Sequence, residues 1–528
     1  MKRQLARISA IISGSSALFL SCSPNRQQQP NVLFILADDY GWNDLGCGGS
    51  DYYETPNIDR IAQNGVFFSN SYSACSVSSP SRASIMTGLA PARHGITNWI
   101  GDPFGLEVAQ RNNTPIIQPS YVEELPVSEK TLVRSLKECG YSTMIAGKWH
   151  LGDTDPIEYG FDVNAGGYSA GNPKGGYFSP YNNPRLSDGP AGEDLNIRLA
   201  RETIDFMDKK LEEKEPFFAF LSFYAVHGPI QTTKDKWEYF RDKAERQGIE
   251  EDGFYVDRTL PVRKKQDNPV YAGLISSMDD AIGLVLDELK AKNALDNTIV
   301  IFTADNGGVA SGDNYSTSCA PLRGGKGRQW EGGTRVPLVM MGPSVKGKGR
   351  KVLSPVIQMD LYPTIMDMIG CPLPGNGTTD GISLRKLIES NEPLEERPLF
   401  WHYPHYGNQG GEPSSYVVRG NWKLIHYWED GRDELYDIKK DISEQDNVIQ
   451  ANTDIATELH NLLFEWLQET NAKIPEKNPC FREADYAQFI IDRQERQLRR
   501  QEEIRKDQLT KSWSPNNDWW GSLVSVND

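Results

Sequence analysis

Short apolar runs alternate with amphipathic helical patterns along most of this 528-residue chain. Val32–Ala37, Phe217–Ala225 and Thr298–Thr303 are nearly continuous apolar segments, which indicates strands buried on both faces. Between them, residues 197–207 and 274–289 place apolar side chains at helical spacing. This alternation predicts an α/β fold, with a large, mostly parallel central sheet sandwiched by helices. Shorter strand candidates are Thr143–Ile145 and Leu338–Met341.

The pattern changes after about residue 395. Tyr416–Arg419, Trp422–Tyr427 and Glu434–Asp437 are short segments separated by Gly-Asn and Asp-Gly turns, which predicts a short antiparallel sheet. A helix with one apolar face follows over residues 455–466. The Arg-, Glu- and Gln-rich stretch 482–510 is typical of a solvated surface helix. We therefore expect a main domain over residues 30–395, a smaller α+β subdomain over 396–480 and a helical extension over 481–528.

Charge and cysteine content exclude several classes of protein. Asp and Glu number 72 against 56 Lys and Arg, a net charge of −16, so a nucleic-acid partner is not expected. The seven cysteines contain no Cys-x-x-Cys pair, which argues against a zinc ribbon or a thioredoxin-like site. No disulfide framework is indicated, although a single bridge stays open.

The N-terminus has the layout of an export signal. Lys2, Arg3 and Arg7 precede the apolar stretch Ile8–Leu20, which is too short and too interrupted to span a bilayer. Residues 1–22 are therefore predicted to be a signal peptide. The small residue before Cys22 resembles a bacterial lipobox, in which the cysteine is lipidated. We expect an exported bacterial protein, either periplasmic or an outer-membrane lipoprotein, that contacts membrane only through an anchor at Cys22.

Acidic side chains follow two of the predicted strands. Asp38 and Asp39 come after the first strand, and Asp305 and Asn306 come after the strand at Thr298–Thr303. Ligands of open α/β sheets bind beyond the carboxyl ends of strands, where the two pairs would meet. Such a set of oxygen donors suits Ca²⁺, with Mg²⁺ as the alternative, rather than zinc. Each pair taken alone could equally be a helix cap or a turn.

The segment from Ser78 to Gly88 reads SSPSRASIMTG. It resembles the signature of the type I sulfatases, the formylglycine-dependent, arylsulfatase-like members of the alkaline phosphatase superfamily: Cys or Ser, any residue, Pro, any residue, Arg, then Thr-Gly. Ser78, Pro80 and Arg82 match it. Cys75 does not, because Val77 stands where the signature requires Pro. The chain thus resembles the bacterial Ser-type members, and the alkaline phosphatase-like fold is expected.

Further motifs extend this resemblance over about residues 30–440. The segment from Gly147 to Gly152 matches the family's Lys-x-His element, and residues 322–333 match its sulfate-binding Lys segment. Taken singly, each Lys or His has an ordinary surface or core explanation, and His94 is expected to be structural. The resemblance implies a catalytic set made of Ser78, Arg82, Lys148, His150, His227 and Lys326. It implies a metal-binding set made of Asp38, Asp39, Ser78, Asp305 and Asn306.

The resemblance also implies the chemistry. A maturase would oxidise Ser78 to formylglycine (3-oxoalanine), whose hydrate attacks the sulfur of a sulfate ester. The cation, Lys148, Lys326 and Arg82 would compensate negative charge. His227 would protonate the leaving oxygen, and His150 would deprotonate the second hydroxyl so that sulfate is expelled. The implied activity is that of a sulfuric ester hydrolase.

Export, a possible lipid anchor and the two-domain layout favour a sulfated carbohydrate substrate and a role in glycan degradation. The two long segments, Asn98–Glu129 and Gly166–Gly192, are candidate specificity loops. Their aromatic residues are candidates for stacking on sugar rings, or for loop packing: Trp99, Tyr168, Tyr177 and Tyr181. Arg323 and His405 are candidates for substrate contact, with packing at a domain junction as the alternative for His405. Two other functions stay open: a phosphatase or phosphodiesterase of the same superfamily, and an inactive glycan-binding lipoprotein with unmodified Ser78.

Overall fold

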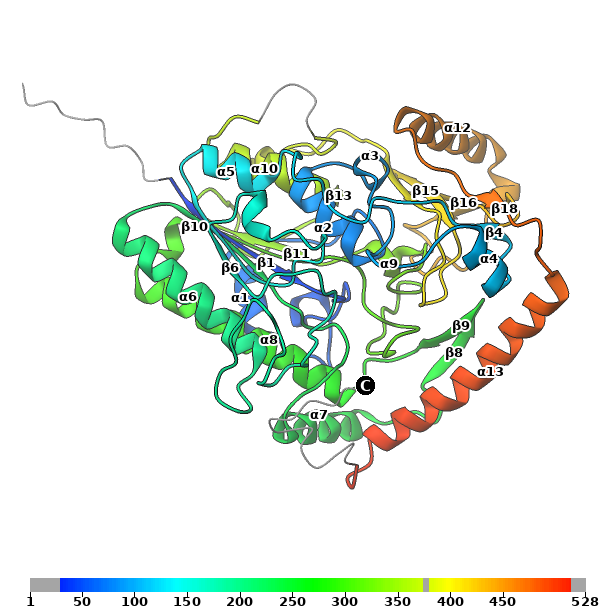
Figure 1. The fold of residues 1–528 in the computed structure, drawn as a ribbon, viewed down its shortest axis with the longest axis horizontal. Coiled ribbons are helices and arrows are strands. Elements are labelled where there is room, and N and C mark those ends of the chain that lie inside the picture. The colour runs from blue at the N-terminus through cyan, green and yellow to red at the C-terminus, as the bar shows by residue number, and fades with distance from the viewer. Residues whose placement is uncertain (1–28, 374–378, 514–528) are drawn as a thin grey trace, which may run out of the picture.

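The computed structural model describes residues 29–373 and 379–513. Its centre is an eight-stranded sheet in the order β12-β2-β11-β10-β1-β7-β5-β6 (Figure 1). The five strands from β10 to β6 run parallel, whereas β11 is antiparallel to both β10 and β2. The strands are β1 (Asn31–Ala37), β2 (Val66–Phe68), β5 (Ser142–Gly147), β6 (Val163–Ala165), β7 (Phe217–Ser222), β10 (Thr298–Ala304), β11 (Leu338–Met341) and β12 (Arg350–Val352).

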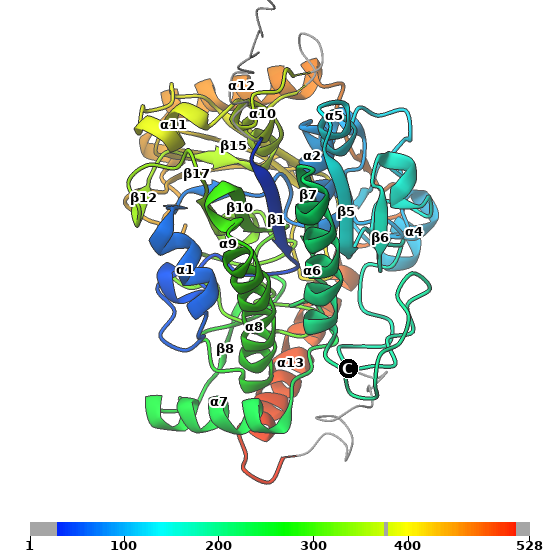
Figure 2. The same ribbon diagram turned by 90° about the vertical axis from the view of Figure 1, so that its left-hand side faces the viewer.

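Helices cover both faces of this sheet, which confirms the predicted α/β sandwich (Figures 1 and 2). Alternate residues of β1 enter two separate cores: Leu33 and Ile35 pack in one, and Val32 and Phe34 pack in the other. Since both faces of the strand are buried, its sequence is apolar without alternation. One side carries α1 (Pro56–Asn64), α6 (Leu195–Glu213), α7 (Lys234–Gln247) and α8 (Pro269–Ala291); the other carries α2 (Ser78–Thr87), α5 (Leu132–Glu138), α10 (Leu361–Met368) and α11 (Arg385–Ser390).

Among the described residues, α8 is the one helix with the length and apolar composition of a membrane span. The sheet and its neighbouring helices bury 83% of that apolar window, so α8 is a core helix here. A disulfide between Cys139 and Cys371 joins the end of α5 to the segment after α10. This is the single disulfide that the cysteine pattern left open.

The C-terminal region forms the predicted antiparallel sheet, in the order β14-β15-β16-β17. Its four strands are β14 (Leu399–Tyr403), β15 (Ser414–Arg419), β16 (Trp422–Tyr427) and β17 (Asp433–Asp437). Helix α12 (Thr453–Glu469) packs on one face through Leu459 and Leu463. The smaller elements of the chain are β3 (Ser71–Tyr72), β4 (Ile116–Ile117), β8 (Phe254–Asp257), β9 (Leu260–Arg263), β13 (Val356–Ile357), β18 (Glu476–Lys477), α3 (Pro91–His94), α4 (Leu106–Asn112), α9 (Glu331–Thr334), and 3-10 turns at Gly46–Gly48, Pro156–Tyr159, Leu295–Asn297, Gln358–Asp360 and Ile449–Ala451.

The predicted surface helix in the extension is α13 (Glu483–Gln508), and its side chains also contact the main domain. It runs back from the C-terminal subdomain to α7 and passes the β8–β9 hairpin (Figure 1). Arg505 near its end is buried and donates from Nε to Asp267 Oδ2 at 2.7 Å. The Glu502 carboxylate accepts from the backbone N–H of Gly253 at 2.7 Å. These contacts anchor the extension to the main domain.

Candidate active site

The two acidic pairs meet because β1 and β10 are parallel neighbours in register, with Ala37 opposite Ala304. The next residues of both strands, Asp38, Asp39, Asp305 and Asn306, are all buried. The backbone N–H of Asp39 donates to Asp305 Oδ1 at 3.1 Å, and Asn306 Nδ2 donates to Asp39 Oδ1 at 2.8 Å. Asp39 has a φ of 61°, in the left-handed region that a non-glycine residue rarely adopts. The chain therefore holds strained backbone at the point where the carboxylates converge.

Ser78 is the first residue of α2, directly above these pairs. Its Oγ lies 3.2 Å from Asp38 Oδ1 and 3.1 Å from Asn306 Oδ1. Arg82 follows one turn later on the same face of the helix, as the spacing of four residues requires. Its Nε donates to Asp305 Oδ2 at 2.9 Å. The sequence signature thus places a hydroxyl and a guanidinium on one side of α2, both against the acidic residues.

Two buried lysines complete the charge balance. Lys148, just after β5, places Nζ 2.5 Å from Asp38 Oδ2. Lys326, in the loop before α9, places Nζ 2.7 Å from Asp39 Oδ2. Together with Arg82 they set three cations against three carboxylates in a site that water barely reaches. Buried charges are stable only when paired in this way.

Two histidines border the same site. His227 Nδ1 lies 2.8 Å from the carbonyl oxygen of Gly228, so Nδ1 carries the proton and Nε2 is the nitrogen that lies 3.6 Å from Asp39 Oδ2. The Tyr177 hydroxyl donates to the backbone carbonyl of His227 at 2.7 Å and thereby holds this segment in place. His150 contacts the Ser79 hydroxyl at 3.4 Å. A Cβ on Gly171 would stand 2.7 Å from the His150 ring, so any other residue there would push against this imidazole.

The buried charges shift the proton affinities of the site in opposite directions. Burial and the Asp305 carboxylate raise the pKa of Asp38 well above its usual value. Burial would also raise the pKa of Asp305, but Arg82 and Lys148 outweigh it and hold that pKa below the usual range. Burial and Lys326 lower the pKa of His227 to about 4, and burial and Lys148 lower the pKa of His150 well below its ordinary value. Both imidazoles are therefore neutral proton acceptors at neutral pH.

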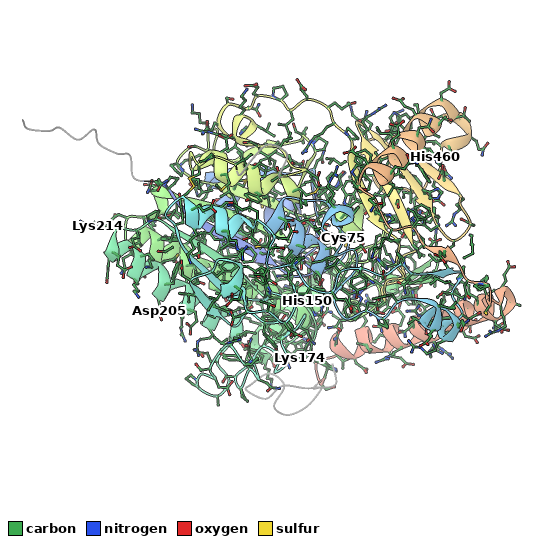
Figure 3. All side chains as sticks on the ribbon, turned by 45° about the horizontal axis from the view of Figure 1, so that its top comes forward. Cys75, His150, Lys174, Asp205, Lys214 and His460 are labelled. Atoms are coloured by element: carbon green, nitrogen blue, oxygen red, sulfur yellow. A yellow bond between two sulfur atoms is a disulfide. The ribbon has the colours of Figure 1, made fainter. Side chains whose placement is uncertain are left out.

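A cavity of about 400 Å³ opens over Ser78. Both long segments singled out in the sequence contribute to it, through Trp99 from the first and Lys174 from the second. Figure 3 shows Lys174 and His150 close to each other in the view. Three polar lining residues lie outside both segments and were not predicted, because no motif marks them and only the fold brings them to the cavity: Asp313, Asn408 and Gln409.

The structure does not bring Arg323 or His405 to this cavity. Arg323 forms a two-pronged ion pair with Asp257, and its guanidinium lies 3.8 Å above the Trp330 ring. His405 is fully buried, with Nε2 2.9 Å from the Thr97 hydroxyl. Both side chains are surrounded by protein neighbours, which favours packing roles, and contact of either one with substrate stays a prediction.

His94 has the structural position expected of it. Its Nε2 lies 3.1 Å from the Ser84 hydroxyl inside the fold.

The aromatic candidates for sugar stacking lie in different places. Trp99 lines the cavity, whereas Tyr177 and Tyr181 are buried in the core. Only Trp99 of these three aromatic rings is placed to meet a ligand.

A serine hydroxyl at a helix N-terminus, next to carboxylates at the ends of parallel strands, is the arrangement expected of a hydrolase of the alkaline phosphatase-like superfamily. Comparison with known proteins specifies the family. The profile described as "Sulfatase" matches residues 30–371, and that described as "N-sulphoglucosamine sulphohydrolase, C-terminal" matches residues 326–472. The chain belongs to the sulfatase family, and it is a sulfuric ester hydrolase.

Named relatives agree with this membership. A protein named "Sulfatase" from Formosa agariphila is 30% identical over 84% of this chain and 90% of its own length. The human N-acetylgalactosamine-6-sulfatase is 30% identical over 71% of this chain and 68% of its own length. Among solved structures, Ps i-CgsB in complex with k-i-k-neocarrahexaose has a TM-score of 0.68 at 28% identity, and the match covers 88% of this chain and 98% of that one.

Proposed function

We propose that this protein is an exported carbohydrate sulfatase that hydrolyses an O-sulfate ester on a sugar of a glycan. The observation that carries the proposal is the position of Ser78. Its Oγ lies within 3.2 Å of Asp38 and Asn306, at the base of a cavity that Lys326, His150 and His227 also line. The Ser78 hydroxyl therefore connects the buried acidic cluster with the cavity and its charged lining groups.

The acidic cluster fits a divalent cation. Asp38, Asp39 and Asp305 each offer an oxygen, and these atoms lie within 4.8 Å of one another. All are buried, and the Asn306 amide adds a neutral oxygen donor. A donor set made only of oxygens suits Ca²⁺, with Mg²⁺ as the alternative. When bound, the cation would supply positive charge that compensates the sulfate group and acidifies a hydroxyl at residue 78.

The surroundings of Ser78 support its conversion to formylglycine. An unmodified serine hydroxyl needs a base to become nucleophilic at neutral pH. The hydrogen-bond partners of Ser78 Oγ are Asp38 and Asn306, whereas the nearby imidazoles bond to Ser79 and Gly228. Formylglycine supplies a hydrated aldehyde with two hydroxyls, one to attack and one to lose its proton. Because Ser78 is only 3% exposed, the maturase would need to act before folding encloses this residue.

The remaining side chains divide the work of binding and proton transfer. Lys326 lines the cavity and is placed to bind the sulfate oxygens. Lys148 is fully buried, and its ammonium group pairs with Asp38 and would compensate negative charge at the base of the site. Arg82 holds Asp305 in position rather than facing the cavity. His227 would first take up a proton at Nε2, the ring nitrogen that carries none in this structure, and would then pass it to the leaving oxygen. His150 would accept the proton of the second hydroxyl.

The cavity lining supports a sugar as the leaving group. The Trp99 ring offers an apolar face for a pyranose ring, and the amides of Asn172, Asn408 and Gln409 offer hydrogen bonds to hydroxyls. The names of the relatives point the same way, because one is an N-acetylgalactosamine-6-sulfatase and another was solved with a neocarrahexaose. The predicted signal peptide and the anchor at Cys22 lie outside the described residues, so export and lipidation stay part of the proposal.

Side-by-side assays test the proposal. Protein from a host with a serine-type maturase should release sulfate from sulfated mono- and oligosaccharides and leave the matched phosphate esters largely intact. Mass analysis of the Ser78 peptide should show loss of two hydrogens. Faster phosphate release would favour the phosphatase alternative. Turnover of a sulfate ester by protein with only unmodified Ser78 would remove formylglycine from the mechanism, and binding without turnover by modified protein would contradict the sulfatase proposal.

A further inference from the structure

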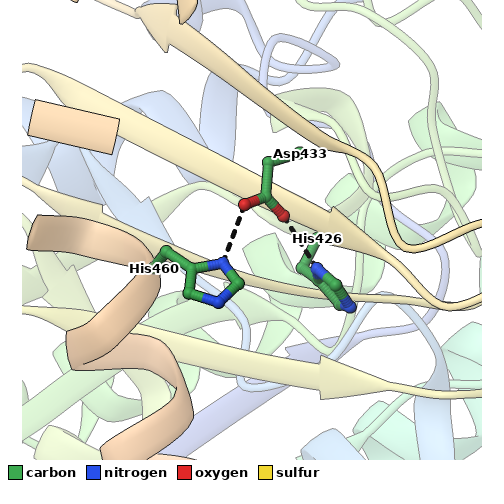
Figure 4. Close-up of side chains that lie close together, drawn as sticks. All are labelled: His426, Asp433 and His460. Carbon is green, nitrogen blue, oxygen red and sulfur yellow. Dashed lines mark hydrogen bonds and ion pairs between the residues drawn. The ribbon is translucent and has the colours of Figure 1, made fainter. Parts of the chain in front are cut away.

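A second cluster of metal-ligating side chains lies in the C-terminal subdomain, formed by His426 of β16, Asp433 of β17 and His460 of α12 (Figure 4). His426 Nδ1 lies 2.7 Å from Asp433 Oδ1, and His460 Nδ1 lies 2.7 Å from Asp433 Oδ2. Figure 3 shows His460 well separated from His150 of the active site. This cluster therefore belongs to a different part of the molecule.

The fold assembles the cluster from three elements. His426 and Asp433 are directly opposed residues of neighbouring antiparallel strands. They point to the face that α12 covers, because Leu424 and Leu435, two residues away on the same strands, pack against that helix. His460 comes from α12 itself, one residue after the buried Leu459. The three side chains therefore converge at one end of the interface between helix and sheet.

The charge of Asp433 is not balanced by a lysine or arginine. Within residues 29–373 and 379–513, the ion partners of its carboxylate are the two imidazoles alone. That carboxylate is 19% exposed. A divalent cation that displaces the two Nδ1 protons would bring positive charge to it and turn all three side chains into ligands.

The donor set selects a class of metal. Two imidazole nitrogens and one carboxylate suit zinc and similar transition metals, whereas calcium prefers oxygen donors alone. The ligand atoms already lie within 4.8 Å of one another. Tetrahedral zinc separates its donors by about 3.3 Å, so side-chain rotations rather than backbone movement would accommodate it. The His460 side chain is 37% exposed, which leaves an open side for a water ligand.

Aromatic neighbours restrict the two imidazoles. The His460 ring stacks on Phe464 with centroids 4.3 Å apart, and His426 meets the Phe464 ring edge-on at 5.0 Å. Trp428 contacts His426 from another side, at 4.7 Å. These contacts keep both rings turned towards Asp433, which lowers the ordering cost of binding an ion.

We propose that His426, Asp433 and His460 bind one Zn²⁺ ion, which fastens α12 to the antiparallel sheet. The site needs neither formylglycine nor the acidic cluster of the active site. The chain would thus hold two metals of different character, a hard cation among oxygens and a transition metal between imidazoles. Zinc here is structural, so its removal should alter stability and leave the catalytic constants close to their original values.

Zinc binding to untagged protein, saturated with Ca²⁺ to occupy the catalytic site, tests the proposal. Isothermal titration should show one Zn²⁺ per chain, and saturation to about 100 times Kd should raise Tm by about 2–3 °C. Added Co²⁺ should give the visible absorption of a tetrahedral nitrogen and oxygen site. His460→Gln should abolish all three signals. His402→Gln is the matched control, because His402 lies in the same subdomain but bonds to Ser415 and the Lys473 carbonyl.

The same experiment can overturn the proposal. Wild-type protein that binds no Zn²⁺ in the presence of Ca²⁺, or a His460→Gln protein that binds as the wild type does, would reduce the cluster to a hydrogen-bonded network. If His460→Gln fails to fold, Asp433→Asn replaces it, since the amide keeps the shape of the side chain. Zinc binding by Asp433→Asn equal to that of the wild type would likewise refute the site.

Discussion

Two buried ionic clusters of this protein contain the same kinds of group, yet only one of them opens onto a cavity. In the active site, Asp38, Asp39 and Asp305 face three cations, and Lys326 and Ser78 line the space above them. At the junction with the C-terminal subdomain, Lys423 of β16 lies 3.2 Å from Glu331 and 2.9 Å from Glu444. All three of those junction side chains are fully buried.

The difference shows that access, rather than charge, separates a reactive cluster from a structural one. The junction cluster also perturbs proton affinity, because burial raises the pKa of Glu444 to about 7 despite the nearby Lys423. None of the three junction residues lines the active-site cavity, and the junction cluster contains no serine at the start of a helix. A perturbed pKa therefore indicates a functional site only together with an opening and a reactive group.

The largest effect should come from replacing Ser78, the reactive group that the active site has and the junction cluster lacks. Ser78→Ala should lower kcat for sulfate release by at least about 10⁴-fold, since the nucleophile is lost while Lys148 and Lys326 remain. The fold and Tm should change little, because the substitution is small. Ser79→Ala, one residue along the same helix, is the matched control and should lose far less activity. Equal losses in the two variants would contradict the assignment of Ser78.

At the junction, a substitution should lower stability and leave catalysis unchanged. Lys423→Met should destabilise the protein by about 3–5 kcal/mol, because Glu331 and Glu444 lose the cation between them. Denaturant unfolding measures this loss, and KM of the protein that stays folded should be unchanged. Arg419→Met is the exposed control, since its surface pair with Glu458 should contribute less than about 1 kcal/mol. A Lys423→Met protein with normal stability and reduced kcat would reverse the comparison.

An effect of intermediate size on the free energy of unfolding should come from lowering the pH, through protonation of His94. Burial lowers the pKa of His94 to about 3, below its value of 6.5 in the unfolded chain. A depressed folded pKa means that the stability is present above pH 6.5 and is lost as the pH falls towards the folded value. From pH 6.5 to about pH 4.5, His94 should remove about 2–3 kcal/mol from the free energy of unfolding.

His94→Gln tests this pH dependence. The variant should be less stable at neutral pH, because the contact with Ser84 changes, but its stability should fall less steeply with acid than that of the wild type. Unfolding curves at several pH values give both slopes. Parallel slopes would show that the loss arises from other histidines whose pKa values burial also lowers: His150, His227, His402 and His405.

The smallest effect should come from the rim of the cavity. Lys174 is exposed there and has no ion pair within the described part of the chain. Lys174→Ala should raise KM for a sulfated sugar roughly 3- to 10-fold and leave kcat within about twofold, and added salt should shrink the difference. Lys214→Ala, which Figure 3 shows far from the site, is the matched control. An unchanged KM for Lys174→Ala would place substrate away from this rim.

Local sequence pattern predicted a large share of the structure. The apolar runs identified β1, β7 and β10. The Ser-x-Pro-x-Arg motif singled out Ser78 and Arg82, which the structure places on one face of α2. The acidic pairs were predicted to meet because parallel strands end at the same edge of a sheet. These inferences succeed because strand burial, helical spacing and strand-end chemistry depend on neighbours along the chain.

Other features depended on segments far apart in sequence. Arg323 and His405 are candidates for substrate contact from sequence alone, but distant residues pack against them: Asp257, Trp330 and Thr97. Asn408 and Gln409 reach the cavity without any motif of their own.

The sequence by itself determined the α/β class, the active-site motif and the identity of the oxygen donors. The tertiary structure alone decided which side chains face the cavity, which cysteines pair and where α13 attaches. It also decided that His426, Asp433 and His460 converge. The physical reason is that side-chain chemistry and local periodicity are written along the chain, whereas burial and access arise only when distant segments pack against one another.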